Sequence, residues 1–128
     1  MKWFELLVTW FSFYDSVGLP SGSYCGTKTL FGESIIGVVN LKSANVLDFA
    51  ISGDFSINCV DEAYSVNGNQ ILLRDIGVSG DCTHDALSDN KITLNSITYD
   101  DANNQIDVSV KYSVAKIDIM MTPGQCAM

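Results

Sequence analysis

The clearest structural signal in the chain is the segment IDVSVKYSVAKIDIMM, residues 106–121. Apolar and polar side chains alternate in this segment on both sides of a short turn at residues 113–115. Successive side chains of a strand point to opposite faces of a sheet, so this pattern predicts two half-buried antiparallel strands joined by a tight turn. The apolar members are Ile106, Val108, Val110, Tyr112, Ile117, Ile119 and Met121.

The same period of two extends outward from this hairpin through most of the chain after residue 20. Polar turns separate the segments, and Asn67-Gly68 predicts a type I′ hairpin turn because both central positions of that turn require positive φ. Only residues 81–90 are expected to form a short helix. The further predicted strands are residues 34–41, 46–52, 55–60, 63–66, 70–76 and 91–99.

These segments predict an all-β fold, an antiparallel up-and-down meander of about eight strands. A closed barrel is favoured over a sandwich because closure removes the exposed strand edges. Two of the later strands are joined by a polar loop at residues 100–104, a cluster of Asp and Asn typical of turns. With 128 residues the chain fits one domain, expected over residues 21–128.

Composition narrows the possible functions. Apolar residues make up 47% of the chain and charged residues 17%, as in a protein that forms a core. The net charge is −8 and Arg74 is the sole arginine, which argues against a nucleic-acid partner, since phosphate binding needs clustered Lys and Arg. His84 is the sole histidine, so mechanisms that need two imidazoles are excluded.

Residues 1–20, MKWFELLVTWFSFYDSVGLP, differ from the rest of the chain. Lys2 precedes an aromatic-rich apolar stretch and small residues follow it, which predicts a secretory signal peptide. Glu5 and Asp15 interrupt the stretch, which is too short to span a bilayer. The alternatives are a retained helix docked by one apolar face and an incorrectly assigned start. That helical face would hold Trp3, Leu6, Leu7, Trp10, Phe13 and Tyr14.

Four cysteines, none in a C-x-x-C pair, predict two disulfides and not a zinc site. A closed meander brings its two ends together, so we expect Cys25–Cys126 with Cys59–Cys82. Four buried free thiols are the alternative. Disulfides and a signal peptide together predict a secreted protein or one on the extracellular surface.

The segment 81–90 carries the histidine and three aspartates. On a helical turn Asp81, Asp85 and Asp89 share one face, where they and His84 are weak candidates for a metal site. We favour a structural explanation, because Asp, Asn and Ser also form turns and helix caps. No metal and no cofactor are therefore expected.

No nucleophile motif or carboxylate pair indicates an enzyme. Asp61 and Glu62 are adjacent, and neighbouring side chains of a strand point to opposite faces, so they are interpreted as a solvated strand end. An enzyme would have to use His84 or paired carboxylates, and we rank it third among the functions.

Aromatic residues are spread over most predicted strands. In a closed barrel some would face a cavity, where tyrosine hydroxyls orient an apolar ligand. An ordinary filled core is the alternative, because eight strands leave an interior just wide enough for side chains or one small ligand. The candidate ligand contacts are Tyr24, Phe49, Phe55, Tyr64 and Tyr112.

Gly22-Ser23-Tyr24 resembles the Gly-x-Trp opening of lipocalins and related calycin barrels. The later meander with its cysteines is similar in style, and the resemblance covers residues 22–126. It implies a cup-shaped barrel that carries a small hydrophobic molecule, with Tyr24 on the barrel floor. The chain departs from the pattern in having Tyr24 where the family has tryptophan, and in lacking a late arginine.

The expected function is non-enzymatic binding, with a small apolar molecule in the barrel interior. The alternative is a structural or assembly protein of a surface layer, coat or filament, which self-associates through its β surface or residues 1–20. The expected partner is therefore a small apolar molecule, another protein or a second copy. Peripheral contact with a membrane stays open, and a nucleic acid is not expected.

Overall fold

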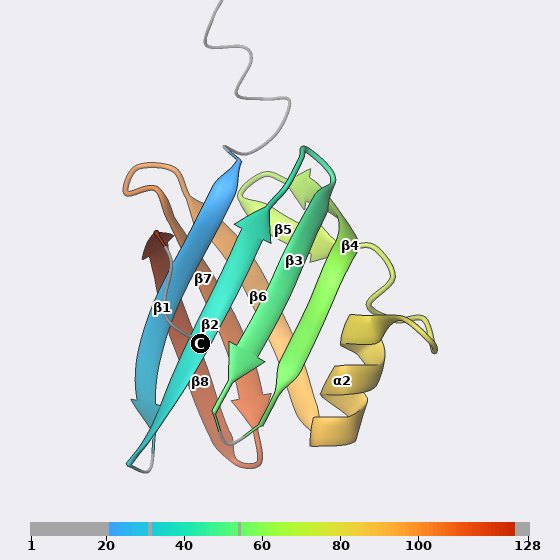
Figure 1. Cartoon of the computed structure of the whole chain (residues 1–128), viewed down its shortest axis with the longest axis vertical. Coiled ribbons are helices and arrows are strands. Elements are labelled where there is room, and N and C mark those ends of the chain that lie inside the picture. Colours follow the sequence, from blue (N-terminus) through green and yellow to red (C-terminus); the bar gives the residue numbers. More distant parts are fainter. Residues whose placement is uncertain (1–20, 31, 54, 125–128) are drawn as a thin grey trace, which may run out of the picture.

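The computed structural model describes residues 21–30, 32–53 and 55–124, and these form a β-barrel with a short helix (Figure 1). The predicted signal peptide or docked helix, residues 1–20, lies outside the described residues. In chain order the elements are β1 (Gly22–Leu30), β2 (Glu33–Leu41), β3 (Val46–Ser52), β4 (Ile57–Asn67), β5 (Gln70–Leu73), α2 (Cys82–Asn90), β6 (Ile92–Asp100), β7 (Gln105–Tyr112) and β8 (Ala115–Pro123).

Each strand pairs antiparallel with the next in the chain, and β8 returns to β1 to close the barrel. The predicted all-β meander, its closure and the short helix are therefore confirmed. Figure 1 shows β1 to β4 forming the near wall and β6 to β8 the far wall, with α2 beside β4 at one end. In the described part of the chain no helix is both long and apolar enough to cross a membrane.

Side chains fill the interior of the barrel. The hairpin predicted at residues 106–121 is confirmed, with Tyr112 opposite Ala115 across a turn at Ser113 and Val114. Its alternating apolar positions are buried, apart from the half-buried Tyr112, and the polar positions between them are exposed or half-buried except for Ser109, which is buried. The largest fully buried side chains are Phe49, Ile35, Leu41, Leu47, Ile51, Ile57, Ile106, Ile117, Ile119, Met121, Val39 and Val108.

Two strand assignments from the sequence were wrong, although they left the total near eight. Strand β1 was missed, so Cys25 lies within the first strand and not before it. Its residues GSYCGTKTL are mostly small or polar and show no regular apolar alternation. Conversely, the predicted strands at 55–60 and 63–66 belong to the single strand β4.

A β-bulge explains why β4 looked like two strands. The register with β3 shifts between Leu47 and Phe49, opposite Asp61, which has a φ of 57°. The Asp61 amide donates to Asp48 Oδ1 at 2.9 Å, and Lys42 Nζ lies 2.6 Å from Asp61 Oδ1 and 3.2 Å from Asp48 Oδ1. These contacts hold the extra residue in place while the strand continues.

The hairpin after β4 is shifted by one residue from its prediction. Asn67 pairs with Gln70, so Gly68 and Asn69 form the turn. Gly68 has a φ of 64°, whereas Asn69 is not among the positive-φ residues, so the predicted type I′ turn centred on Asn67-Gly68 was wrong. The following strand is also shorter than predicted, because β5 ends at Leu73 and not at residue 76.

The barrel has two seams where few residues are paired. At the β8–β1 seam the register pairs are Tyr24 with Pro123 and Cys25 with Thr122. A Cβ added to Gly26 would overlap the carbonyl oxygen of Met120, so the two backbones are in close contact there. At the β5–β6 seam the described residues provide one register pair, Gln70 with Thr98.

Candidate functional site

The aromatic candidates lie at both ends of the barrel and in its middle. Tyr24 and Tyr99 meet edge to face, with ring centroids 6.4 Å apart, and both hydroxyls donate to Asn104 Oδ1, at 2.6 and 2.8 Å. Burial raises the pKa of Tyr24, and the neighbouring Tyr99 adds to the effect. This group packs the end of the barrel where the β6–β7 loop lies.

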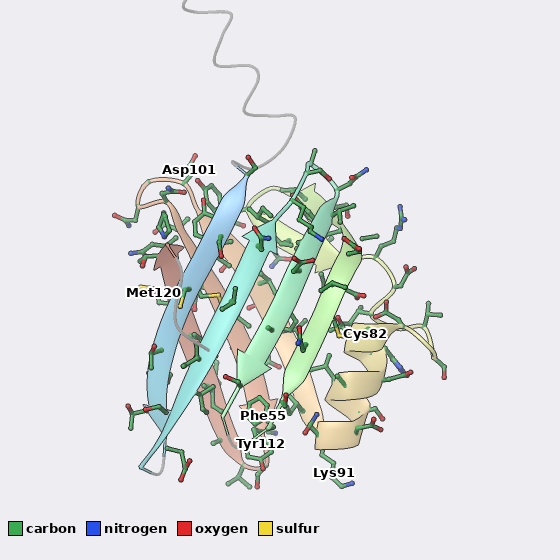
Figure 2. All side chains as sticks on the ribbon, viewed as in Figure 1. Phe55, Cys82, Lys91, Asp101, Tyr112 and Met120 are labelled. Atoms are coloured by element: carbon green, nitrogen blue, oxygen red, sulfur yellow. A yellow bond between two sulfur atoms is a disulfide. The ribbon has the colours of Figure 1, made fainter. Side chains whose placement is uncertain are left out.

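The remaining candidates do not join Tyr24 around one shared space. The Tyr64 hydroxyl donates to the carbonyl of Ser43 at 2.8 Å, and burial raises its pKa. Phe55 and Tyr112 contact each other at the opposite end, with centroids 4.8 Å apart (Figure 2). Phe49 is fully buried in the middle. Their rings therefore contribute to packing of the interior and of its two ends.

A surface depression lies at the second seam, and we call it the β5–β6 slot. Strand β5 has four residues and β6 has nine, so most of β6 has no strand partner on this side. A register shift between Leu94 and Ser96 further displaces β6 at this level. The slot has a volume of about 200 Å³. Its lining residues are Gln70, Ile71, Leu72, Leu73, Ile76, Leu94, Asn95, Ser96 and Ile97.

The lining of the slot is uncharged and consists mostly of apolar residues. Its lining contains no charged side chain, and its polar members are Gln70, Asn95 and Ser96. Apolar walls with a few polar groups at the rim are typical of ligand sites. Known drug-sized sites begin near ~300 Å³, whereas a dry apolar cavity of about 150 Å³ holds benzene. The volume of the slot lies between these two values.

Sequence reasoning did not find this slot. The run QILLRDI, residues 70–76, was interpreted as one continuous strand because it is largely apolar. The charged pair Arg74-Asp75 was the signal that the strand stops, since both residues are exposed and the chain turns after Leu73. A strand that ends early leaves its neighbour unpaired.

Helix α2 lies in the sequence between the two segments that line the slot, and it begins at an N-terminal cap. The Asp81 side chain accepts a hydrogen bond from the His84 amide at 3.1 Å, and Lys91 ends the helix in a left-handed conformation. The predicted disulfide Cys59–Cys82 is confirmed and joins the first turn of α2 to β4. Cys126 lies outside the described residues, so Cys25–Cys126 stays a prediction.

Glu62 is buried, which corrects the prediction of a solvated strand end. The bulge at Asp61 turns Glu62 toward α2, where the residue is 7% exposed and its side chain accepts a hydrogen bond from Thr83 Oγ1 at 2.9 Å. Burial raises the pKa of Glu62, and the nearby carboxyls of Asp81 and Asp75 raise it further. The opposite-face rule failed here because it assumes a regular strand without a bulge.

Three of the four residues considered for a metal site make other contacts in the structure, and the fourth, Asp89, is exposed. Asp81 caps the helix, while Asp85 Oδ1 lies 3.1 Å from His84 Nδ1 and accepts from the Gly80 amide at 3.2 Å. The contact with His84 lowers the pKa of Asp85. Within residues 21–30, 32–53 and 55–124, no three His, Cys, Asp or Glu side chains form a group able to hold a metal ion.

Comparisons of the chain with protein-family models, with curated proteins and with solved structures found no match.

Proposed function

We propose that this chain is a non-enzymatic binding protein that takes up a small apolar molecule at the β5–β6 slot. The observation that carries the proposal is the slot itself: an uncharged, largely apolar opening of about 200 Å³ between two strands that share one register pair among the described residues. Access through the wall suits a barrel whose two ends are packed by aromatic groups.

The proposal keeps the carrier role that the lipocalin resemblance implies but changes the location of the ligand. The shared feature is the closed eight-stranded antiparallel barrel. In a cup-shaped carrier the ligand enters at one end, whereas here it would lie between β5 and β6. An extracellular or cell-surface setting is part of the proposal, and the disulfide Cys59–Cys82 is compatible with it.

Indole is a suitable first probe because it has two fused rings and a single N–H donor. The upper limit for small ligands is roughly 0.3 to 1.5 kcal/mol per non-hydrogen atom, and about 0.5 kcal/mol for each such atom of indole corresponds to a Kd within about 0.1–1 mM. Ligand-observed NMR relaxation measures affinities in this range. Wild type is expected to slow the tumbling of indole in a saturable manner.

Two tryptophan substitutions distinguish binding at the slot from nonspecific binding elsewhere on the protein. Leu94→Trp places a large side chain in the slot lining and is expected to abolish indole binding. Val60→Trp adds the same side chain on the outer face of β4, where Val60 is 62% exposed, and is expected to leave binding unchanged. Equal binding by both variants would refute the slot as the ligand site.

A further inference from the structure

Helix α2 occupies the part of the β5–β6 seam that lies beyond the slot. Beyond Leu73 there is no β5 to separate β4 from β6, and α2 contacts both of these strands. Leu87 of α2 is buried in the core, with Ala86 packed against it. Figure 1 shows α2 beside the lower half of β4, below β5. Ile76, in the segment between β5 and α2, lines the slot, and α2 contacts β6, the strand that forms the other wall of the slot.

The polar and covalent attachments of α2 to the barrel wall are on the β4 side. Cys82 is bonded to Cys59, and Thr83 donates to Glu62. At the other end of the helix, Asn90 Nδ2 donates to the carbonyl of Ser56 at 3.2 Å, just before β4 begins. Toward β6 the described contacts of α2 are apolar packing and the chain connection through Lys91.

The disulfide attachment is covalent, whereas the attachment through Glu62 is electrostatically unfavourable. The Glu62 carboxyl faces Asp81 and Asp75 as well as Thr83, so its charged form is disfavoured in this position. Figure 2 shows Cys82 where the helix meets β4. The disulfide is therefore the attachment that does not depend on a weak polar contact.

We infer that α2 is a cover over the lower end of the slot, and that the Cys59–Cys82 disulfide holds it closed and so limits the length of ligand that the slot admits. This inference rests on the proposed function. Lys91 joins α2 directly to β6, so without the cross-link the first turn of the helix can swing away from β4 about that connection, and the slot then extends from Leu94 toward Ile92 and the space occupied by Leu87. Longer apolar ligands gain access when the cross-link is absent.

A dithiol reductant can open the cover chemically. Cys82 is exposed and Cys59 is buried, so the attacking thiolate reaches the Cys82 sulfur. The S–S bond breaks as a mixed disulfide forms, and the second thiol of the reductant then displaces Cys82. Two electrons and two protons pass to the protein, leaving thiols at Cys59 and Cys82, and the reductant becomes a cyclic disulfide.

The test compares indole with 2-phenylindole, which carries one more ring at the same polar group. The protein is the full chain with Cys59→Ser and Cys82→Ser together, which removes this cross-link and leaves Cys25 unchanged. Ser88→Ala, at an exposed position of the same helix, is the matched control. The double variant is expected to bind 2-phenylindole about tenfold tighter than wild type, with indole affinity altered less than about twofold. The control should match wild type for both probes.

Amide hydrogen exchange separates opening of the cover from general loosening. In the double variant the amides of α2 are expected to lose more protection than those of β7 and β8. Equal losses in all three elements, or a 2-phenylindole affinity equal to that of wild type, would overturn the inference. If neither protein binds indole, the proposed function fails, and α2 protection alone decides whether the helix is a cover held by the disulfide.

A second variant serves if the double variant does not fold. Leu87→Ala keeps the disulfide and truncates the buried side chain by which the helix packs into the core. This variant is expected to bind 2-phenylindole more tightly than wild type, because the slot gains length at that end. Unchanged 2-phenylindole binding by a folded Leu87→Ala protein would overturn the inference.

Discussion

The two weakly paired seams of this barrel are closed in different ways. At the β8–β1 seam a glycine stands where a side chain would not fit, and the backbone at Gly26 lies directly against that of Met120. At the β5–β6 seam the strands remain apart below the Gln70–Thr98 pair, and a slot and a helix occupy the gap. A small number of register pairs is therefore not sufficient to leave an opening between two strands.

The difference between the two seams indicates what would let a ligand enter between two strands. Close backbone contact excludes a ligand because no apolar surface is left uncovered. A strand that ends early leaves the inward side chains of its neighbour partly covered, here at Leu94. We therefore expect the first seam to contribute mainly to stability, whereas ligand binding is proposed for the second, and substitutions at each seam test that division.

The largest effect is expected from Gly26→Ala. A single methyl group at this position would strike the Met120 carbonyl, which belongs to the backbone and cannot rotate away. The free energy of unfolding is expected to fall by about 4 kcal/mol. Gly77→Ala is the matched control, because nothing lies within 4 Å of an added Cβ there. Denaturant unfolding of both variants measures the difference, and equal stabilities would show that the β8–β1 seam is not closely packed.

Removing the disulfide at the second seam is expected to have the next largest effect. Cys59 and Cys82 are 23 residues apart, and a cross-link of this span contributes about 3 kcal/mol in the chain-entropy model. Combined Cys59→Ser and Cys82→Ser should lower the denaturant midpoint accordingly under oxidising conditions. An unchanged midpoint would mean that α2 is held by its packing alone.

Glu62→Gln is expected to raise the free energy of unfolding at pH 7, which is a smaller effect than the two losses above and of opposite sign. The folded state raises the pKa of Glu62, so this carboxyl adds stability at low pH and that stability is lost as the pH rises through the folded-state pKa. The variant should therefore be more stable than wild type at pH 7, with a difference that shrinks toward pH 4. The amide oxygen of the substituted side chain would still accept the hydrogen bond from Thr83.

Glu33→Gln is the control for this pH series, because Glu33 lies exposed at the start of β2. Its unfolding free energy should follow that of wild type at both pH values. A Glu62→Gln protein that is less stable than wild type at pH 7 would contradict the electrostatic account of α2 attachment.

The sequence predicted the parts of the fold that follow from local pattern. Strands β2, β3, β7 and β8 alternate or are continuously apolar, and their bounds fall within a few residues of the prediction. The even number of cysteines, together with the expected closure of the meander, predicted the Cys59–Cys82 disulfide. The helix followed from a cluster of capping residues that no strand pattern interrupts.

The features that failed depend on interactions between distant residues. Strand β1 has few apolar side chains and is held by its pairing with β2 along its whole length. The bulge at Asp61 depends on Asp48 and Lys42, which lie on or next to another strand. The slot depends on the early end of β5 and a shift in β6 together. None of these arrangements leaves a periodic signal in the chain.

A ¹H–¹⁵N NMR titration of the oxidised wild-type protein with indole would locate the ligand within the barrel. We expect saturable shifts concentrated at the amides of β5 and of residues 94–97, with the amides beside the β8–β1 seam unmoved. Shifts centred on Phe49 and Val39 would place the ligand in the barrel interior instead. Complete absence of shifts at millimolar indole would contradict the assignment of a binding site to the β5–β6 seam.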